Sequence, residues 1–120
     1  MPTILVVDDS AVSQRLLGYT LMRVGYTVIT AGHGREALQR LGEAHVDLVI
    51  ADLAMPEVDG ISLLQQIRAD ERLCRLPLVM LTASGQDEDR LIAEAAGAND
   101  FLTKPASSRD VIEAVQRLVG

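Results

Sequence analysis

The chain has 120 residues, of which 48% are hydrophobic, enough to fill the core of one globular domain. Its net charge of -6 and its 2% aromatic content argue against direct binding of nucleic acid, because a basic surface and a stacking platform for bases are both missing. We expect no membrane segment, since no apolar run is long enough, and no secretory signal, since no basic segment and long apolar stretch precede the first strand. The single cysteine, Cys74, indicates a reducing, cytoplasmic setting.

Five short apolar runs are predicted to be strands. They cover residues 4–7, 26–30, 48–51, 78–81 and 101–103. The runs are continuous rather than alternating, as expected of parallel strands buried on both faces. Five segments with helical spacing of apolar residues follow them, at 11–24, 34–43, 60–69, 87–96 and 108–119. Gly25 and Gly97 follow two of these helices, where a left-handed C-terminal residue is common.

All five helical segments are amphipathic, and their regularly spaced apolar residues are expected to face inward. In the first segment these are Val12, Leu16, Leu17, Leu21 and Val24, and in the fourth they are Leu91, Ile92, Ala95 and Ala96. The regular alternation of strand and helix predicts an α/β fold of (βα)5 type. It matches the flavodoxin-like, doubly wound parallel sheet with strand order 2-1-3-4-5 and helices on both faces. Ligands of such sheets bind at the carboxyl ends of the strands, near the switch point.

Polar residues stand where these strands end. Asp8 and Asp9 follow the first strand, Asp52 the third, Thr82 the fourth, and Lys104 the fifth. We therefore expect three carboxylates, a hydroxyl and an ammonium in one crevice. Two carboxylates about 4 Å apart repel by roughly 4 kcal/mol at an effective dielectric constant near 20. A divalent cation would relieve this repulsion, and oxygen ligands without a histidine or cysteine cluster favour Mg²⁺ over zinc.

Mg²⁺, lysine and threonine around a carboxylate indicate phosphoryl chemistry. An aspartate can accept a phosphoryl group to form an acyl phosphate. Catalysis of such a transfer consists of positioning and charge neutralisation.

At this point the sequence resembles the receiver domain of two-component response regulators. The motifs that carry the resemblance are "ILVVDDS", "DLVIADLAMPEVDG", "LVMLTAS" and "AGANDFLTKP". The resemblance covers the whole chain, residues 1–120, as one domain. The resemblance implies that Asp52 accepts phosphate from a histidine kinase or a phosphotransfer protein. It implies Mg²⁺, with Mn²⁺ as a substitute, held by Asp9, Asp52 and the backbone carbonyl of Ala54, with Asp8 assisting through water. Lys104 would contact the phosphoryl group.

The resemblance also implies a conformational switch. Thr82 would move toward the phosphate and Phe101 would turn inward, repacking a face made by residues 87–96, 101–103 and 108–119. That face would contact an unidentified output domain or target, or a second copy of the chain. We expect the helix at 87–96 to be among the looser segments, because it has few large apolar anchors. The resemblance also suggests a cis bond between Lys104 and Pro105.

Each of these residues has a simpler structural interpretation. Asp8 and Asp9 could merely start the first helix. Thr82 could be a strand-end or capping hydroxyl, Lys104 a surface lysine, and Phe101 a packing residue.

The remaining residues of interest are expected to be structural. We expect Met55-Pro56 to form a turn and Asp59 and Ser84 to cap helices. His33 and His45 are expected to be exposed, since neither ends a strand on the active side.

Two further functions remain open on the sequence. One is an aspartyl-phosphate phosphatase of the haloacid dehalogenase type, a class that places a second aspartate two residues after the first; here that position is Ser10. The other is a binding module on the same scaffold that is never phosphorylated. The acidic set favours a stoichiometric phosphoacceptor, which is not an enzyme, over both.

Overall fold

The computed structural model describes residues 1–53, 60–83 and 87–119. Strands and helices alternate along the chain as β1 (Thr3–Val7), α1 (Ala11–Met22), β2 (Thr27–Ala31), α2 (Gly34–Glu43), β3 (Leu48–Asp52), α3 (Gly60–Ala69), β4 (Leu78–Thr82), α4 (Asp87–Ala96), β5 (Asp100–Thr103) and α5 (Ser108–Val119). The strands are parallel and lie in the order β2-β1-β3-β4-β5. The predicted flavodoxin-like (βα)5 fold is therefore confirmed.

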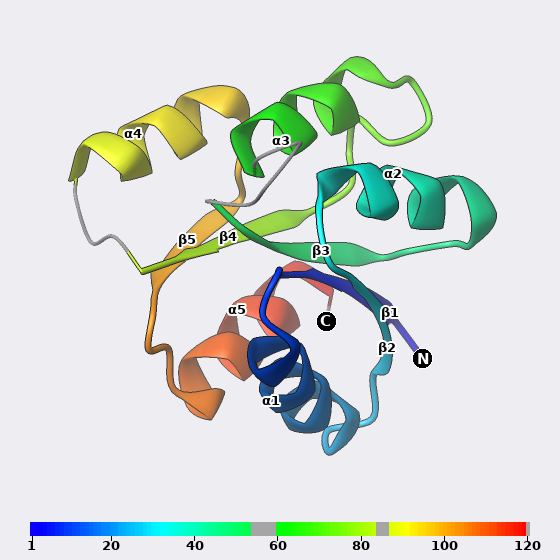
Figure 1. Ribbon diagram of the computed structural model, residues 1–120, viewed down its shortest axis with the longest axis vertical. Coiled ribbons are helices and arrows are strands. Elements are labelled where there is room, and N and C mark those ends of the chain that lie inside the picture. Colours follow the sequence, from blue (N-terminus) through cyan, green and yellow to red (C-terminus); the bar gives the residue numbers. More distant parts are fainter. Residues whose placement is uncertain (54–59, 84–86, 120) are drawn as a thin grey trace.

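The sheet lies between two layers of helices (Figure 1). Helices α1 and α5 cover one face, and α2, α3 and α4 cover the other. Successive residues of a strand point to opposite faces, so each strand supplies both halves of the core. Ile4 and Val6 of β1 pack under α1 and α5, whereas Leu5 and Val7 pack under α2 to α4. This double burial is why the central strands β1, β3 and β4 appear in the sequence as continuous apolar runs.

Two helices end where the sequence places a glycine. Gly25 has a φ of 99°, and Gly97 has a φ of 107°. The Tyr26 N–H donates to the Leu21 carbonyl at 3.2 Å, the long hydrogen bond of a Schellman motif. Helix α1 therefore ends at Met22, two residues before the predicted limit.

The inward face of α1 differs from the prediction. Leu17 and Leu21 pack inward as expected, but Val12 and Leu16 are each 64% exposed, and Val24 is exposed as well. The helix instead approaches the sheet through Gly18, where an added Cβ would lie 3.8 Å from Val28 Cγ1. The helix therefore meets the sheet along Leu17, Gly18 and Leu21, and its other large apolar residues stay at the surface.

Helix α4 shows the same effect. Its one buried side chain among the described residues is that of Ala93, and Ala96 packs beside it. Leu91 and Ile92, which were predicted to face inward, are exposed, as is Ala95. A helix that rests on alanines has a narrow contact stripe, so its bulky residues remain at the surface.

The described helices contain no stretch that is both long and apolar enough to cross a bilayer.

Candidate functional site

Asp8, Asp52 and Lys104 converge at one edge of the sheet because their side chains point to the same face of it. Each lies two residues beyond a side chain of the core cluster under α1 and α5, namely Val6, Ile50 and Leu102. Residues two apart on a strand point to the same face. The carboxyl ends of β1, β3 and β5 therefore direct these three side chains to the same side of the sheet edge.

Lys104 joins the two aspartates. Its Nζ lies 2.8 Å from Asp8 Oδ2 and 3.1 Å from Asp52 Oδ2. Asp8 is almost fully buried, with 2% of its surface exposed, and the Asp52 side chain is 12% exposed. Burial by itself would lower the pKa of Lys104, but its hydrogen bonds to Asp8 and Asp52 and their negative charges raise that pKa above the usual lysine value. The ammonium is thus held in its charged form between two acids.

The start of α1 fixes the Asp8 carboxylate from the other side. The Ser10 N–H donates to Asp8 Oδ1 at 2.9 Å, and the Ser10 hydroxyl caps α1 by accepting from the Ser13 N–H at 3.3 Å. The first turn of α1 holds no acidic residue. Ser10, rather than the aspartate pair, therefore starts the helix, and the interpretation of Asp8 and Asp9 as helix-start residues is not supported.

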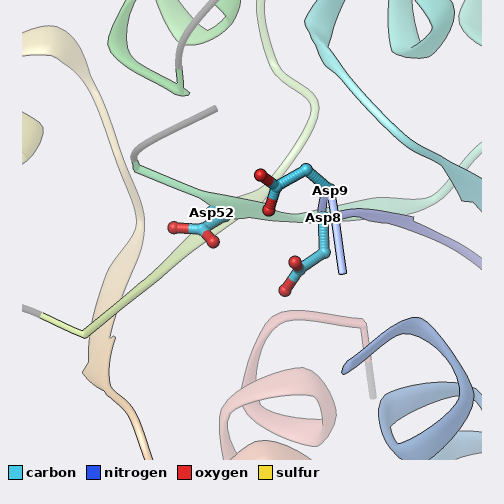
Figure 2. Close-up of side chains that lie close together, drawn as sticks. All are labelled: Asp8, Asp9 and Asp52. Atoms are coloured by element: carbon cyan, nitrogen blue, oxygen red, sulfur yellow. The ribbon is translucent and has the colours of Figure 1, made fainter. Parts of the chain in front are cut away.

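Asp9 completes a three-carboxylate group with Asp8 and Asp52 (Figure 2). Each residue offers one oxygen, and these oxygens all lie within 4.8 Å of one another. One ammonium cannot neutralise three carboxylates, so the group retains an excess of negative charge at close range. A cluster of carboxylate oxygens beside a buried strand end fits a hard divalent cation such as Mg²⁺. Ala54, whose carbonyl was predicted to join this set, lies outside the described residues, as do Met55, Pro56, Asp59 and Ser84.

Thr82 and Phe101 lie on the opposite face of the sheet from this group. Thr82 ends β4 and is 3% exposed, and its carbonyl accepts from the Lys104 N–H at 2.6 Å. Phe101 is 7% exposed and packs in the core cluster under α2, α3 and α4. Register pairs Thr82 with Thr103, two residues beyond Phe101, so both predicted switch residues point toward the α4 side. Phe101 already lies inward here, and a second orientation of its ring stays a prediction.

The Lys104–Pro105 bond is cis, as the family resemblance implied.

The two histidines lie outside this group. His33 is only partly exposed, contrary to prediction, because it caps α2: its Nδ1 accepts from the Glu36 N–H at 3.1 Å. His45 is exposed as predicted, and its Nε2 lies 2.9 Å from Asp47 Oδ1.

Gln14 is a residue near the site that the sequence analysis did not single out. Its side-chain nitrogen lies 2.7 Å from the backbone carbonyl oxygen of Asp8. The sequence did offer a signal. Gln14 lies three positions before Leu17 and seven before Leu21, so a polar residue falls on the inward side of α1.

Comparison with known proteins agrees with this geometry. Residues 4–116 match the family model of the response regulator receiver domain. The chain is 40% identical over 116 residues to the alkaline phosphatase synthesis transcriptional regulatory protein PhoP of Bacillus subtilis, covering 97% of this chain and 48% of that protein. It is 36% identical over 119 residues to chemotaxis protein CheY1 of Helicobacter pylori strain J99, covering 98% of this chain and 96% of that protein.

Solved structures show the same likeness. A putative response regulator from Chloroflexus aurantiacus superposes with a TM-score of 0.95 at 34% identity, covering 99% of this chain and 98% of the other. Vibrio cholerae CheY4 gives a TM-score of 0.93 at 33% identity, covering 98% of each chain. The chain spans about half the length of several curated relatives it matches, including PhoP.

Proposed function

Since this chain belongs to the response regulator receiver family of two-component signalling proteins, we propose that it is a phosphoacceptor switch phosphorylated on Asp52. The donor is the phosphohistidine of a sensor histidine kinase or of a histidine phosphotransfer protein. One observation carries the proposal: Lys104 Nζ reaches both Asp52 and Asp8, at 3.1 and 2.8 Å, beside the third carboxylate of Asp9.

The transfer is a displacement at phosphorus. A carboxylate oxygen of Asp52 forms a bond to phosphorus while the phosphorus–nitrogen bond of the donor breaks. The electron pair returns to the imidazole nitrogen of the donor, which takes up a proton from water. Lys104, already held at Asp52 Oδ2, orients the carboxylate and screens the charge of the incoming phosphoryl oxygens. The chain acts as a stoichiometric acceptor that assists its own phosphorylation and dephosphorylation.

Mg²⁺, with Mn²⁺ as a substitute, is the cofactor that the acidic group fits. Asp9 and Asp52 would hold it together with the Ala54 carbonyl, and Asp8 would assist through water. When bound, the cation neutralises charge on the acceptor and phosphoryl oxygens.

Phosphorylation places a charge of about -2 beside Lys104. Thr82, at the same edge, would donate its hydroxyl to a phosphoryl oxygen, and Phe101 would follow it on the α4 side of the sheet. Helix α4 is suited to respond, because Ala93 is its one buried side chain in the described part of the chain. The face formed by α4, β5 and α5 would then bind an output domain, a target protein or a second copy. The exposed Leu91 of α4 supports such contact.

The rest of the proposal concerns the setting of the domain. Residues 1–120 form one receiver domain that acts in the cytoplasm, without direct contact to nucleic acid or membrane. The exposed free thiol of Cys74 and the net charge of -6 support this setting.

Incubation with Mg²⁺ and a small acyl phosphate tests the proposal. Intact mass should show the addition of one phosphoryl group, and Asp52→Asn should abolish it. Asp110→Asn, an exposed aspartate of α5, is the matched control and should label normally. Labelling of Asp52→Asn at the wild-type rate would remove Asp52 from this role.

The phosphatase alternative finds no support in the site. Ser10, at the position of the second aspartate in that class, caps α1. We expect no turnover of phosphomonoesters.

A further inference from the structure

The side chain of Gln14 bridges two backbone carbonyls. Its Nε2 lies 2.7 Å from the Asp8 carbonyl oxygen and 3.3 Å from the Ala31 carbonyl oxygen. Carbonyl oxygens only accept, and a side-chain amide nitrogen carries two hydrogens. Both donors of Gln14 are therefore used, and both are used on the backbone at the end of the sheet.

These two carbonyls stand where the ladder between β1 and β2 stops. The last paired residues are Val7 and Ala31, and the Asp8 N–H donates to the Ala31 carbonyl at 3.0 Å. Beyond this point the segments that follow β1 and β2 separate, one into α1 and the other into α2. Gln14 supplies the next cross-link from its side chain, so that both the N–H and the carbonyl of Asp8 are held.

Gln14 is itself rigidly placed. Its backbone N–H donates to the Ser10 carbonyl at 3.0 Å, which closes the first turn of α1. Ser10 in turn donates its N–H to Asp8 Oδ1 at 2.9 Å. These hydrogen bonds link Asp8, Ser10 and Gln14 into one closed ring, and Asp9 lies between Asp8 and Ser10 in the sequence.

We propose that Gln14 is a positioning residue for the acidic group: by clamping the backbone at Asp8, it fixes where the Asp8 and Asp9 carboxylates point relative to Asp52. Gln14 does not touch the cation or the phosphoryl group. The inference rests on the proposed function for the identity of the cation, and it adds a residue of α1 to the machinery that binds it. Groups that orient metal ligands typically contribute about 10–100-fold to metal affinity.

A purely structural role makes a different prediction. If the amide only fastened α1 to β2, its loss would lower stability and leave cation affinity unchanged in the folded protein. Metal affinity and stability must therefore be measured on the same variants.

Gln14→Met keeps the length of the side chain and removes both donors, and Gln14→Glu keeps its shape while replacing the donors by acceptors. Gln39→Glu, at an exposed position of α2, is the control for the added negative charge. The probe is Mn²⁺, titrated into each folded protein and followed by the electron paramagnetic resonance of the free ion. Urea unfolding without metal gives the stability of each variant.

We expect Gln14→Met to weaken Mn²⁺ binding by about tenfold or more, and Gln39→Glu to leave it unchanged. Gln14→Glu separates the two explanations by sign. An added negative charge alone would tighten cation binding, whereas loss of the clamp weakens it. Gln14→Glu also keeps the inference testable if Gln14→Met does not fold.

Hydrogen exchange in metal-free protein provides the second readout. The Asp8 and Ser10 amides should exchange faster in both Gln14 variants than in the wild-type chain. Dissociation constants within twofold of wild type in both variants, or unchanged exchange at these amides, would overturn the inference alone. A wild-type chain that does not bind Mn²⁺ would instead overturn the proposed cofactor, and this inference with it.

Discussion

Gly60, the first residue of α3, lies directly against the end of the strand that carries Asp52. A Cβ added at Gly60 would lie 2.8 Å from Leu53 Cα and 3.1 Å from the Asp52 carbonyl carbon, with the Asp52 carbonyl oxygen closer still. The Gly60 N–H also donates to the Leu53 carbonyl at 2.9 Å. The neighbours are backbone atoms, which cannot turn aside as a side chain can, so Gly60→Ala must push α3 and the end of β3 apart.

Overpacking of this kind costs about 1–3 kcal/mol, and the better helix propensity of alanine offsets at most about 1 kcal/mol of it. Because the crowded neighbours are backbone atoms, we take the upper end of the overpacking cost, and an offset of about 1 kcal/mol then leaves an expected loss of about 2 kcal/mol of unfolding free energy. We also expect slower phosphorylation, because displacement of the β3 end moves the Asp52 carboxylate relative to Lys104.

Gly42→Ala provides the matched control. Gly42 lies in α2, is exposed, and an added Cβ there meets no atom within 4 Å. This variant should gain up to about 0.5–1 kcal/mol and label normally. Urea unfolding followed by circular dichroism measures stability, and intact mass after incubation with an acyl phosphate measures labelling. The reasoning fails if Gly60→Ala matches the wild-type protein in both measurements.

Three further predictions concern charged side chains. Arg68 donates through Nη1 to the Leu76 carbonyl at 2.7 Å and through Nη2 to the Gly97 carbonyl at 2.9 Å. Arg68→Ala should lose about 1–3 kcal/mol in urea unfolding, and Arg68→Lys, which lacks the planar fork, should recover little of it; full recovery by lysine would contradict this. Lys104→Met leaves the buried Asp8 carboxylate without its ammonium partner, so stability should fall at neutral pH. Because the folded state raises the pKa of Lys104, its contribution to the unfolding free energy is complete below the ordinary value of 10.5 and is lost as pH rises through the higher folded-state value. A stability difference between Lys104→Met and the wild-type protein that persists unchanged at the most alkaline pH would argue against this. The Thr3 N–H lowers the pKa of Asp47 below its ordinary 3.8, so Asp47→Asn should be less stable than wild type above that pH, and the difference should disappear as pH falls through the lowered value; equal stability of the two proteins at pH 6 would refute this.

The sequence predicted the strands well because the three central ones, β1, β3 and β4, are buried on both faces, whereas the edge strands β2 and β5 are partly exposed but still carry apolar residues. Each central strand appears as a continuous apolar run, and the structure moves the limits of the strands by a single residue, as in the addition of Asp52 to β3 and the shift of β2 to 27–31. The site was accessible for a related reason. In a parallel sheet the carboxyl ends share one edge, so the polar residues that end strands 1, 3 and 5 had to meet there.

The helix faces were harder to predict because small residues decided them. Periodicity in α1 favoured Val12 and Leu16 as inward residues, but the inward side of the helix runs along Leu17, Gly18 and Leu21, which leaves both exposed. In α4 the buried residue is Ala93, and a small alanine contributes little to the hydrophobic periodicity from which an inward face is predicted. Gln14 was missed because its role depends on two carbonyls that only the folded chain brings within reach.

The central claim is that Asp52, held by Lys104 beside Asp8 and Asp9, receives the phosphoryl group. The most direct measurement is to phosphorylate the chain from a phosphohistidine donor in the presence of Mg²⁺, reduce the acyl phosphate with borohydride, and sequence the peptides by mass spectrometry. Reduction converts a phosphorylated aspartate to homoserine, and the account predicts homoserine at position 52. Homoserine at another aspartate of the wild-type chain, with position 52 unchanged, would contradict it.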